Sequence, residues 1–173
     1  MRVEKAWFAI LAALLWQMAA DAGPEDDLKR GIEAYDRGDV VSAVAVFRKA
    51  AEQGYAPAQV RLAYILDESE QNVEARKWYQ RAAEQGNPDG QFGLGQMYWI
   101  GEGGDKDEAR AFEWISKAAE GGLTAAMRTL AVSYEQGGMG LPKDAAQAHA
   151  WLERAAEHGD RWAKQHLAQT PAN

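Results

Sequence analysis

The stretch Lys117-Ala118-Ala119-Glu120-Gly121-Gly122 decides the fold, because segments 49–54, 81–86 and 154–159 end in nearly the same way. The four closing glycines are 32, 36 and 37 residues apart. A fixed period of this size is typical of repeat proteins in which every unit is one supersecondary structure. In each unit an alanine lies three positions before a Trp or Val, namely Ala43 and Val46, Ala75 and Trp78, Ala111 and Trp114, Ala148 and Trp151.

A second set of columns follows each glycine. A small residue comes four positions later, a leucine eight positions later, and another small residue directly after it, as in Ala126, Leu130 and Ala131. Spacings of three and four place these side chains on one helical face. Each unit is therefore predicted to hold an A helix with this face and a B helix that ends at the glycine. The expected helices are 25–37, 40–53, 56–68, 72–85, 88–100, 106–121, 124–136, 143–158 and 161–169.

Residues 90–122 carry the fullest version of the pattern, with Leu94-Gly95, Tyr98, Asp107 and Trp114 before the closing segment. This unit resembles the Sel-one-like repeat family, relatives of the tetratricopeptide repeats. The resemblance implies an all-α fold, an α-solenoid of about four stacked antiparallel helix pairs and a C-terminal capping helix. The expected organisation is a signal peptide at 1–22, a tetratricopeptide-like leading pair at 23–57, repeats at 58–89, 90–125 and 126–160, and a capping helix with tail at 161–173.

The N-terminus differs from the repeats. Arg2 and Lys5 precede an apolar run over 6–18, and an Ala-x-Ala pattern ends at Ala22. This order is typical of a secretory signal peptide, and the run is shorter than the roughly 20 residues that a membrane span needs. The alternative is a buried amphipathic first helix. We expect an exported protein, periplasmic or secreted, with cleavage after Ala22 and no stable membrane insertion afterwards.

The charge and composition of the chain limit the classes of partner that it is expected to bind. The formal net charge is −7, and no cluster of Lys and Arg is present, so nucleic acid is not an expected partner. The chain contains no cysteine, which excludes disulfides and lipid attachment through a thiol. The remaining expectation is a soluble protein that binds another protein or a peptide.

Several residues invite a more specific interpretation. The recurrence of Trp78, Trp114 and Trp151 at one column favours core packing over a ligand-stacking platform. Trp99 lies outside that column and stays open as a partner contact. The glycine-rich segment 101–105 lacks the preceding strand and the Gly-Lys-Ser/Thr of a phosphate loop, so a tight turn is expected.

Catalytic and metal chemistry find little support. His149, His158 and His166 are nine and eight residues apart, whereas two zinc ligands on one helical face lie three or four apart. None of the serines at 42, 69, 116 and 133 has lysine three positions later, as penicillin-recognising enzymes require. No cofactor is expected. A small envelope or cell-wall hydrolase remains the alternative function.

The favoured hypothesis is a non-catalytic scaffold or adaptor of a bacterial-type envelope or the secreted space. Stacked helix pairs curve, and we expect the A helices to line the concave side and to bind a peptide or a partner helix there. A free-standing chaperone-like factor would look the same in sequence. The candidate partner contacts are polar residues of the A helices that point away from the Leu and Tyr seam: Gln59, Arg61, Gln91, Gln96 and Arg128.

Overall fold

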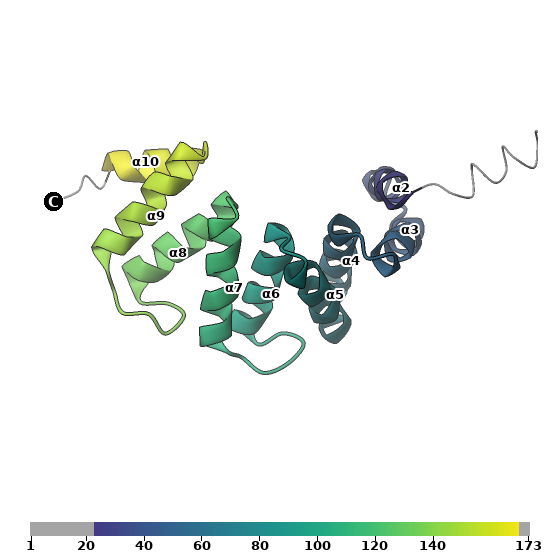
Figure 1. Ribbon diagram of the computed structural model, residues 1–173, viewed down its shortest axis with the longest axis horizontal. Coiled ribbons are helices and arrows are strands. Elements are labelled where there is room, and N and C mark those ends of the chain that lie inside the picture. The colour runs from purple at the N-terminus through teal and green to yellow at the C-terminus, as the bar shows by residue number, and fades with distance from the viewer. Residues whose placement is uncertain (1–22, 170–173) are drawn as a thin grey trace, which may run out of the picture.

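The computed structural model describes residues 23–169, and every regular element in that range is a helix. The helices run along the chain as successive pairs followed by one last helix (Figure 1). Their bounds are α2 Pro24–Asp36, α3 Val40–Glu52, α4 Ala56–Glu68, α5 Asn72–Glu84, α6 Pro88–Ile100, α7 Glu108–Glu120, α8 Thr124–Gln136, α9 Ala145–Glu157 and α10 Arg161–Gln169.

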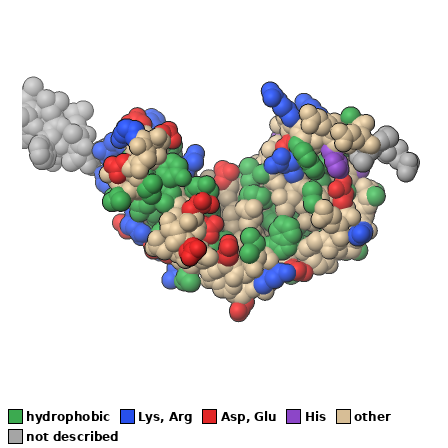
Figure 2. Space-filling view, turned by 180° about the vertical axis from the view of Figure 1, so that it is seen from behind, with side chains coloured by type: hydrophobic (Ala, Val, Ile, Leu, Met, Phe, Trp, Pro, Cys, Tyr) green, Lys and Arg blue, Asp and Glu red, His purple; other side chains and the backbone are tan. Residues whose placement is uncertain are grey.

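Each helix packs against the next one along the chain, and α4 also contacts α2 and α6. The A helices are therefore α2, α4, α6, α8 and α10, and the B helices are α3, α5, α7 and α9. The stack bends into an arc whose two ends rise on either side of a hollow (Figures 1 and 2). This arrangement confirms the predicted all-α solenoid of four helix pairs with a final helix.

The helix ends explain why the boundaries were predictable to within two residues. The four closing glycines have φ between 80° and 91°, a region that an L side chain rarely adopts, so each B helix stops there. The starts of α7 and α9 lie two residues later than expected. Asp107 and Asp144 accept hydrogen bonds from the backbone N–H of Arg110 and Gln147, so these aspartates cap the helices instead of lying within them.

The core follows one register, because helices α2 to α9 all have 13 residues. The eighth residue of each B helix is fully or almost fully buried, as Ile115 shows. A Cβ on Gly95 would approach the Cγ1 of Ile115 to 2.6 Å, so the A helix comes close at this point. The members of this buried column are Phe47, Tyr79, Ile115 and Leu152.

The tryptophan column packs at the edge of the core and not at its centre. Trp78 is buried, but Trp114 and Trp151 are only partly buried. A basic side chain three residues later covers each ring, with Lys117 Nζ 4.2 Å from the ring centre of Trp114. The equivalent pairs are Arg81 over Trp78 and Arg154 over Trp151. The repeated Lys or Arg thus forms a cation–π contact as well as lying in the last helical turn.

Helix α2 departs from the other A helices at its third residue. Gly90 holds this position in α6 and lies against Ala82 and Ala83 of the preceding B helix. In α2 the same position is Asp26, whose side chain is 63 % exposed.

Candidate binding groove

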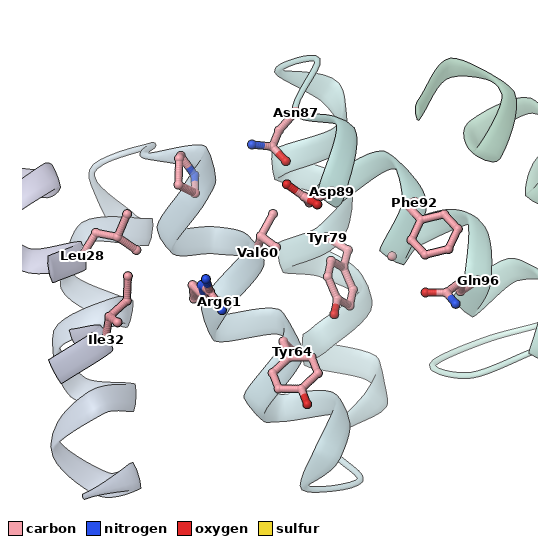
Figure 3. A pocket seen from close by; sticks show the side chains of 12 residues that line it. Leu28, Ile32, Val60, Arg61, Tyr64, Tyr79, Asn87, Asp89, Phe92 and Gln96 are labelled. Carbon is pink, nitrogen blue, oxygen red and sulfur yellow. The ribbon is translucent and has the colours of Figure 1, made fainter. Parts of the chain in front are cut away.

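A groove of about 460 Å³ runs across α2, α4 and α6 (Figure 3). Six of its twelve lining residues are the fifth and ninth residues of these A helices, which lie one helical turn apart on the same face. Figure 3 shows side chains of α2, α4 and α6 around one shared space. The six side chains at these positions are Leu28, Ile32, Val60, Tyr64, Phe92 and Gln96.

A second groove of about 480 Å³ continues across α6, α8 and α10. Phe92 and Gln96 line both grooves, so we treat them as one inner groove that crosses all five A helices. Figure 2 shows hydrophobic side chains on both walls of the hollow. The second part is lined chiefly by Trp99, Arg128, Thr129, Val132 and Trp162.

The floor of the first part is the ring of Tyr79, which belongs to α5. Gly93 makes room for it, since a Cβ on Gly93 would lie 2.5 Å from the ring. Burial raises the pKa of the Tyr79 hydroxyl, and the nearby charges of Asp67 and Glu68 raise it further. The floor is therefore a neutral aromatic surface under a negative potential.

Three of the five predicted contact residues line the inner groove, namely Arg61, Gln96 and Arg128. Arg61 and Gln96 are exposed. Arg128 is partly buried, with its Nε 3.6 Å from a carboxylate oxygen of Asp160 and its guanidinium 5.8 Å from the ring centre of Trp162. Trp99, which the sequence left open, lines the groove as well.

Gln59 was wrongly interpreted as a surface contact, because only 3 % of it is exposed. Its side-chain amide donates to the carbonyl oxygen of Ala51 at 3.0 Å and accepts from Gln85 at 2.7 Å. Gln91 occupies the same helical position in α6, is partly buried, and reaches Ala83 at 3.5 Å. Both glutamines bind the last turn of the preceding B helix and hold the units together.

The sequence contained a signal for the packing role of the two glutamines and another for the apolar residues of the groove. Gln59 and Gln91 each follow the small residue that lies four positions after a closing glycine, and this shared position indicated a shared packing role. The apolar groove residues, such as Val60, Tyr64 and Phe92, were missed because only polar side chains were considered as contacts. Their spacing of four, on the side away from the leucine column, could have identified them.

An acidic rim lies beside the groove, at the C-terminal end of α4 and in the loop after α6. It consists of Asp67, Glu68 and Glu102. Burial raises the pKa of Asp67, and the negative charges of Glu102 and Glu68 raise it further. Among residues 23–169, the structure shows no ion pair for any of the three. By contrast, Arg48 Nη1 lies 2.5 Å from Glu74, which has a lowered pKa.

The described residues offer no grouping of three or more His, Cys, Asp or Glu side chains that could hold a metal ion. His166 stacks on Trp162 with ring centres 4.8 Å apart and contacts Glu135 at 2.9 Å, which ties α10 to α8. None of the helices within 23–169 combines the length and the apolar character needed to cross a membrane.

The repeat pattern matches the family model described as the Sel1 repeat over residues 9–24, 31–55, 56–87, 88–123 and 124–160. The chain belongs to the Sel1 repeat family. The match to 31–55 takes in most of the pair that the sequence reasoning described as tetratricopeptide-like. The match to 9–24 overlaps the predicted signal peptide, which lies outside the described residues.

Curated relatives share the repeats with this chain. The ERAD-associated E3 ubiquitin-protein ligase component HRD3A of Arabidopsis thaliana is 33 % identical over 139 residues, which are 70 % of this chain and 20 % of the relative. The alginate biosynthesis protein AlgK of Pseudomonas aeruginosa is 34 % identical over 131 residues, 73 % of this chain and 27 % of the relative. The chain thus spans only about a fifth to a quarter of these proteins.

Solved structures agree with the fold. The chain superposes on a Sel1 repeat protein from Oxalobacter formigenes with a TM-score of 0.77 and 29 % identity, covering 88 % of this chain and 46 % of that one. It superposes on c5321, a protective antigen of uropathogenic Escherichia coli with the same repeat fold, with a TM-score of 0.76 and 33 % identity. This second match covers 90 % of this chain and 35 % of c5321.

Proposed function

We propose that this Sel1 repeat protein is a non-catalytic scaffold that binds a segment of another protein in the inner groove. The observation that carries this proposal is the apolar lining of the groove, where large side chains remain accessible. Tyr64 is 45 % exposed and Trp162 is 37 % exposed, on opposite parts of the same groove. Exposed aromatic side chains gathered in a concave surface are typical of protein-binding sites.

The relatives support a role in assemblies. HRD3A is named as a component of a ubiquitin ligase, and another relative, SKT5 of Saccharomyces cerevisiae, is named as a regulator of chitin synthase. Both names describe proteins that act together with an enzyme. We infer the same kind of role here, in which the chain holds a partner and performs no chemistry itself.

The environments of Ser69 and Ser133 give no support to the alternative of a hydrolase. The hydroxyl of Ser133 is buried and donates to the carbonyl oxygen of Thr129 at 2.7 Å, and Ser69 donates to Ile65 at 2.7 Å. No histidine contacts either hydroxyl in the hydrogen bonds that the structure shows. We therefore propose no catalytic step.

Photo-crosslinking tests the scaffold proposal. A photoreactive amino acid is placed in the groove at Tyr64 or Val132, and at the exposed positions Val41 or Glu113 of B helices as controls. Crosslinking in the producing cells should trap the same partner protein from both groove positions and none from the controls. Crosslinks to that partner from the B-helix positions alone would place binding on the other face and refute the proposal.

We further propose that the chain is exported and processed after Ala22. The basic, apolar and Ala-x-Ala order of residues 2–22 supports this proposal. Mass spectrometry of the protein recovered outside the cytoplasm should find Gly23 as the first residue. An intact N-terminus in the cytoplasm would refute export. It would favour the alternative of a buried amphipathic first helix, in line with the repeat match to residues 9–24.

A further inference from the structure

The acidic rim and the inner groove are parts of one surface. Asp67 is the twelfth residue of α4, three positions after Tyr64 of the groove, so both lie on the same helical face. The negative charge of Asp67 and Glu68 raises the pKa of Tyr79, which forms the groove floor. The rim therefore sets the electrostatic potential that a segment in the groove would meet.

Positive charge near this part of the groove is limited. Arg61 is the one cation that lines the first part, and Asp89 lines the same part. Among the described residues no Lys or Arg forms an ion pair with Asp67, and the one guanidinium beside the loop of Glu102 belongs to Arg76, which lies against Gly103 and Gly104 and over the ring of Tyr98. Figure 2 shows acidic side chains gathered on the wall of the hollow that is nearer to the N-terminus. A cation on a bound segment would therefore stabilise the ionised carboxylates of the rim.

We infer that the partner segment presents apolar side chains to the inner groove and Lys or Arg side chains to the acidic rim. This inference rests on the proposed scaffold function and adds the chemistry of the partner. Apolar side chains would fill the spaces between Leu28, Val60 and Phe92, while the cations contact Asp67, Glu68 and Glu102. The apolar contacts supply most of the affinity, and the rim fixes the direction in which the segment lies.

The experiment measures binding of two synthetic peptide pools to the full chain. Both pools contain the same random apolar residues, and one pool ends in lysines while the other ends in glutamates. The lysine pool should bind at least about fivefold more tightly, and this preference should shrink as salt rises, because salt screens exposed charges. Equal binding of the two pools would overturn the inference.

A matched pair of variants localises the effect. Asp67→Asn/Glu102→Gln removes two charges from the rim, and Glu120→Gln/Glu157→Gln removes two charges from exposed ends of B helices. The rim variant should lose the preference for lysine, whereas the control should keep it within about twofold. If the control loses it equally, only net charge matters and the inference is wrong.

Two other outcomes separate this inference from the scaffold proposal. If Tyr64→Ala/Phe92→Ala weakens both pools equally and the wild-type chain shows no charge preference, the groove binds segments but the rim does not select them. Residues 2–18 of this chain also combine basic and apolar residues. If the lysine pool binds only after Arg2→Ala/Lys5→Ala, the chain's own N-terminal segment competes for the groove, and the inferred chemistry of the occupant is supported; if neither chain binds it, the inference is wrong.

Discussion

The seam between the helices and the inner groove are built from the same A helices, yet their residues behave in opposite ways from unit to unit. At the seventh position α4, α6 and α8 all have leucine, and at the eighth position all have a small residue, each buried. At the fifth position, which lines the groove, the same helices have Val60, Phe92 and Arg128. The ninth position changes equally, with Tyr64, Gln96 and Val132.

This difference shows which constraint acts on each face. The seventh and eighth positions of these A helices pack against a neighbouring helix in each unit, so leucine and a small residue recur there. A groove position instead lines the hollow and is only partly buried or exposed. Its side chain can therefore differ from unit to unit, to fit one part of a bound segment. The seam therefore determines stability and the groove determines binding, and substitutions in each should have separate effects.

The largest effect is expected in the seam. Ile115→Ala should lower the free energy of unfolding by about 2–5 kcal/mol, because the side chain is fully buried and leaves a cavity. Trp114→Ala removes more atoms but should cost less, since the ring is only partly buried. Urea unfolding followed by circular dichroism measures both. A larger loss for Trp114 would mean that the tryptophan column belongs to the seam.

A smaller effect is expected where a polar residue is part of the seam. Gln59→Ala should cost about 1–3 kcal/mol, because the carbonyl of Ala51 and the amide of Gln85 lose a buried partner. Gln96→Ala, at an exposed groove position, should stay within about 0.5 kcal/mol. The same unfolding measurement compares them. Equal stability of the two variants would contradict the assignment of Gln59 to the seam.

The smallest effect, and one of opposite sign, is expected at the rim. Folding raises the pKa of Asp67, so the folded chain favours its protonated form, and this contribution is lost as pH rises through the raised pKa. Asp67→Asn should therefore raise the melting temperature slightly near pH 7, and the gain should shrink as pH falls toward about 3.9, the ordinary value. Glu120→Gln serves as the exposed control. A lower melting temperature for Asp67→Asn would mean that its charge stabilises the fold.

The sequence predicted the fold well because the seam repeats. Each buried column occurs in four copies, so one copy supports the interpretation of the others. Capping aspartates mark where helices begin, and the closing glycines mark where they end. The groove was predicted less well because its positions vary and carry no such redundancy. Arg61, Gln96 and Arg128 were placed in it, but Gln59 was misassigned because a single sequence does not show that its amide reaches back to Ala51. The pKa of Asp67 is raised by burial and in part by the charge of Glu102, 35 positions away, and only the folded structure brings these two residues together.

We expect the inner groove to bind the partner without being needed for folding. The most direct test is the dissociation constant of the partner identified by crosslinking, measured by calorimetry for two matched variants. Tyr64→Ala/Phe92→Ala removes groove side chains, and Val41→Ala/Val73→Ala removes exposed apolar side chains of B helices. With helical content preserved in both, the groove variant should bind at least tenfold more weakly, about 1.4 kcal/mol, and the control within about twofold. Unchanged affinity in the groove variant, with loss in the control, would contradict the account.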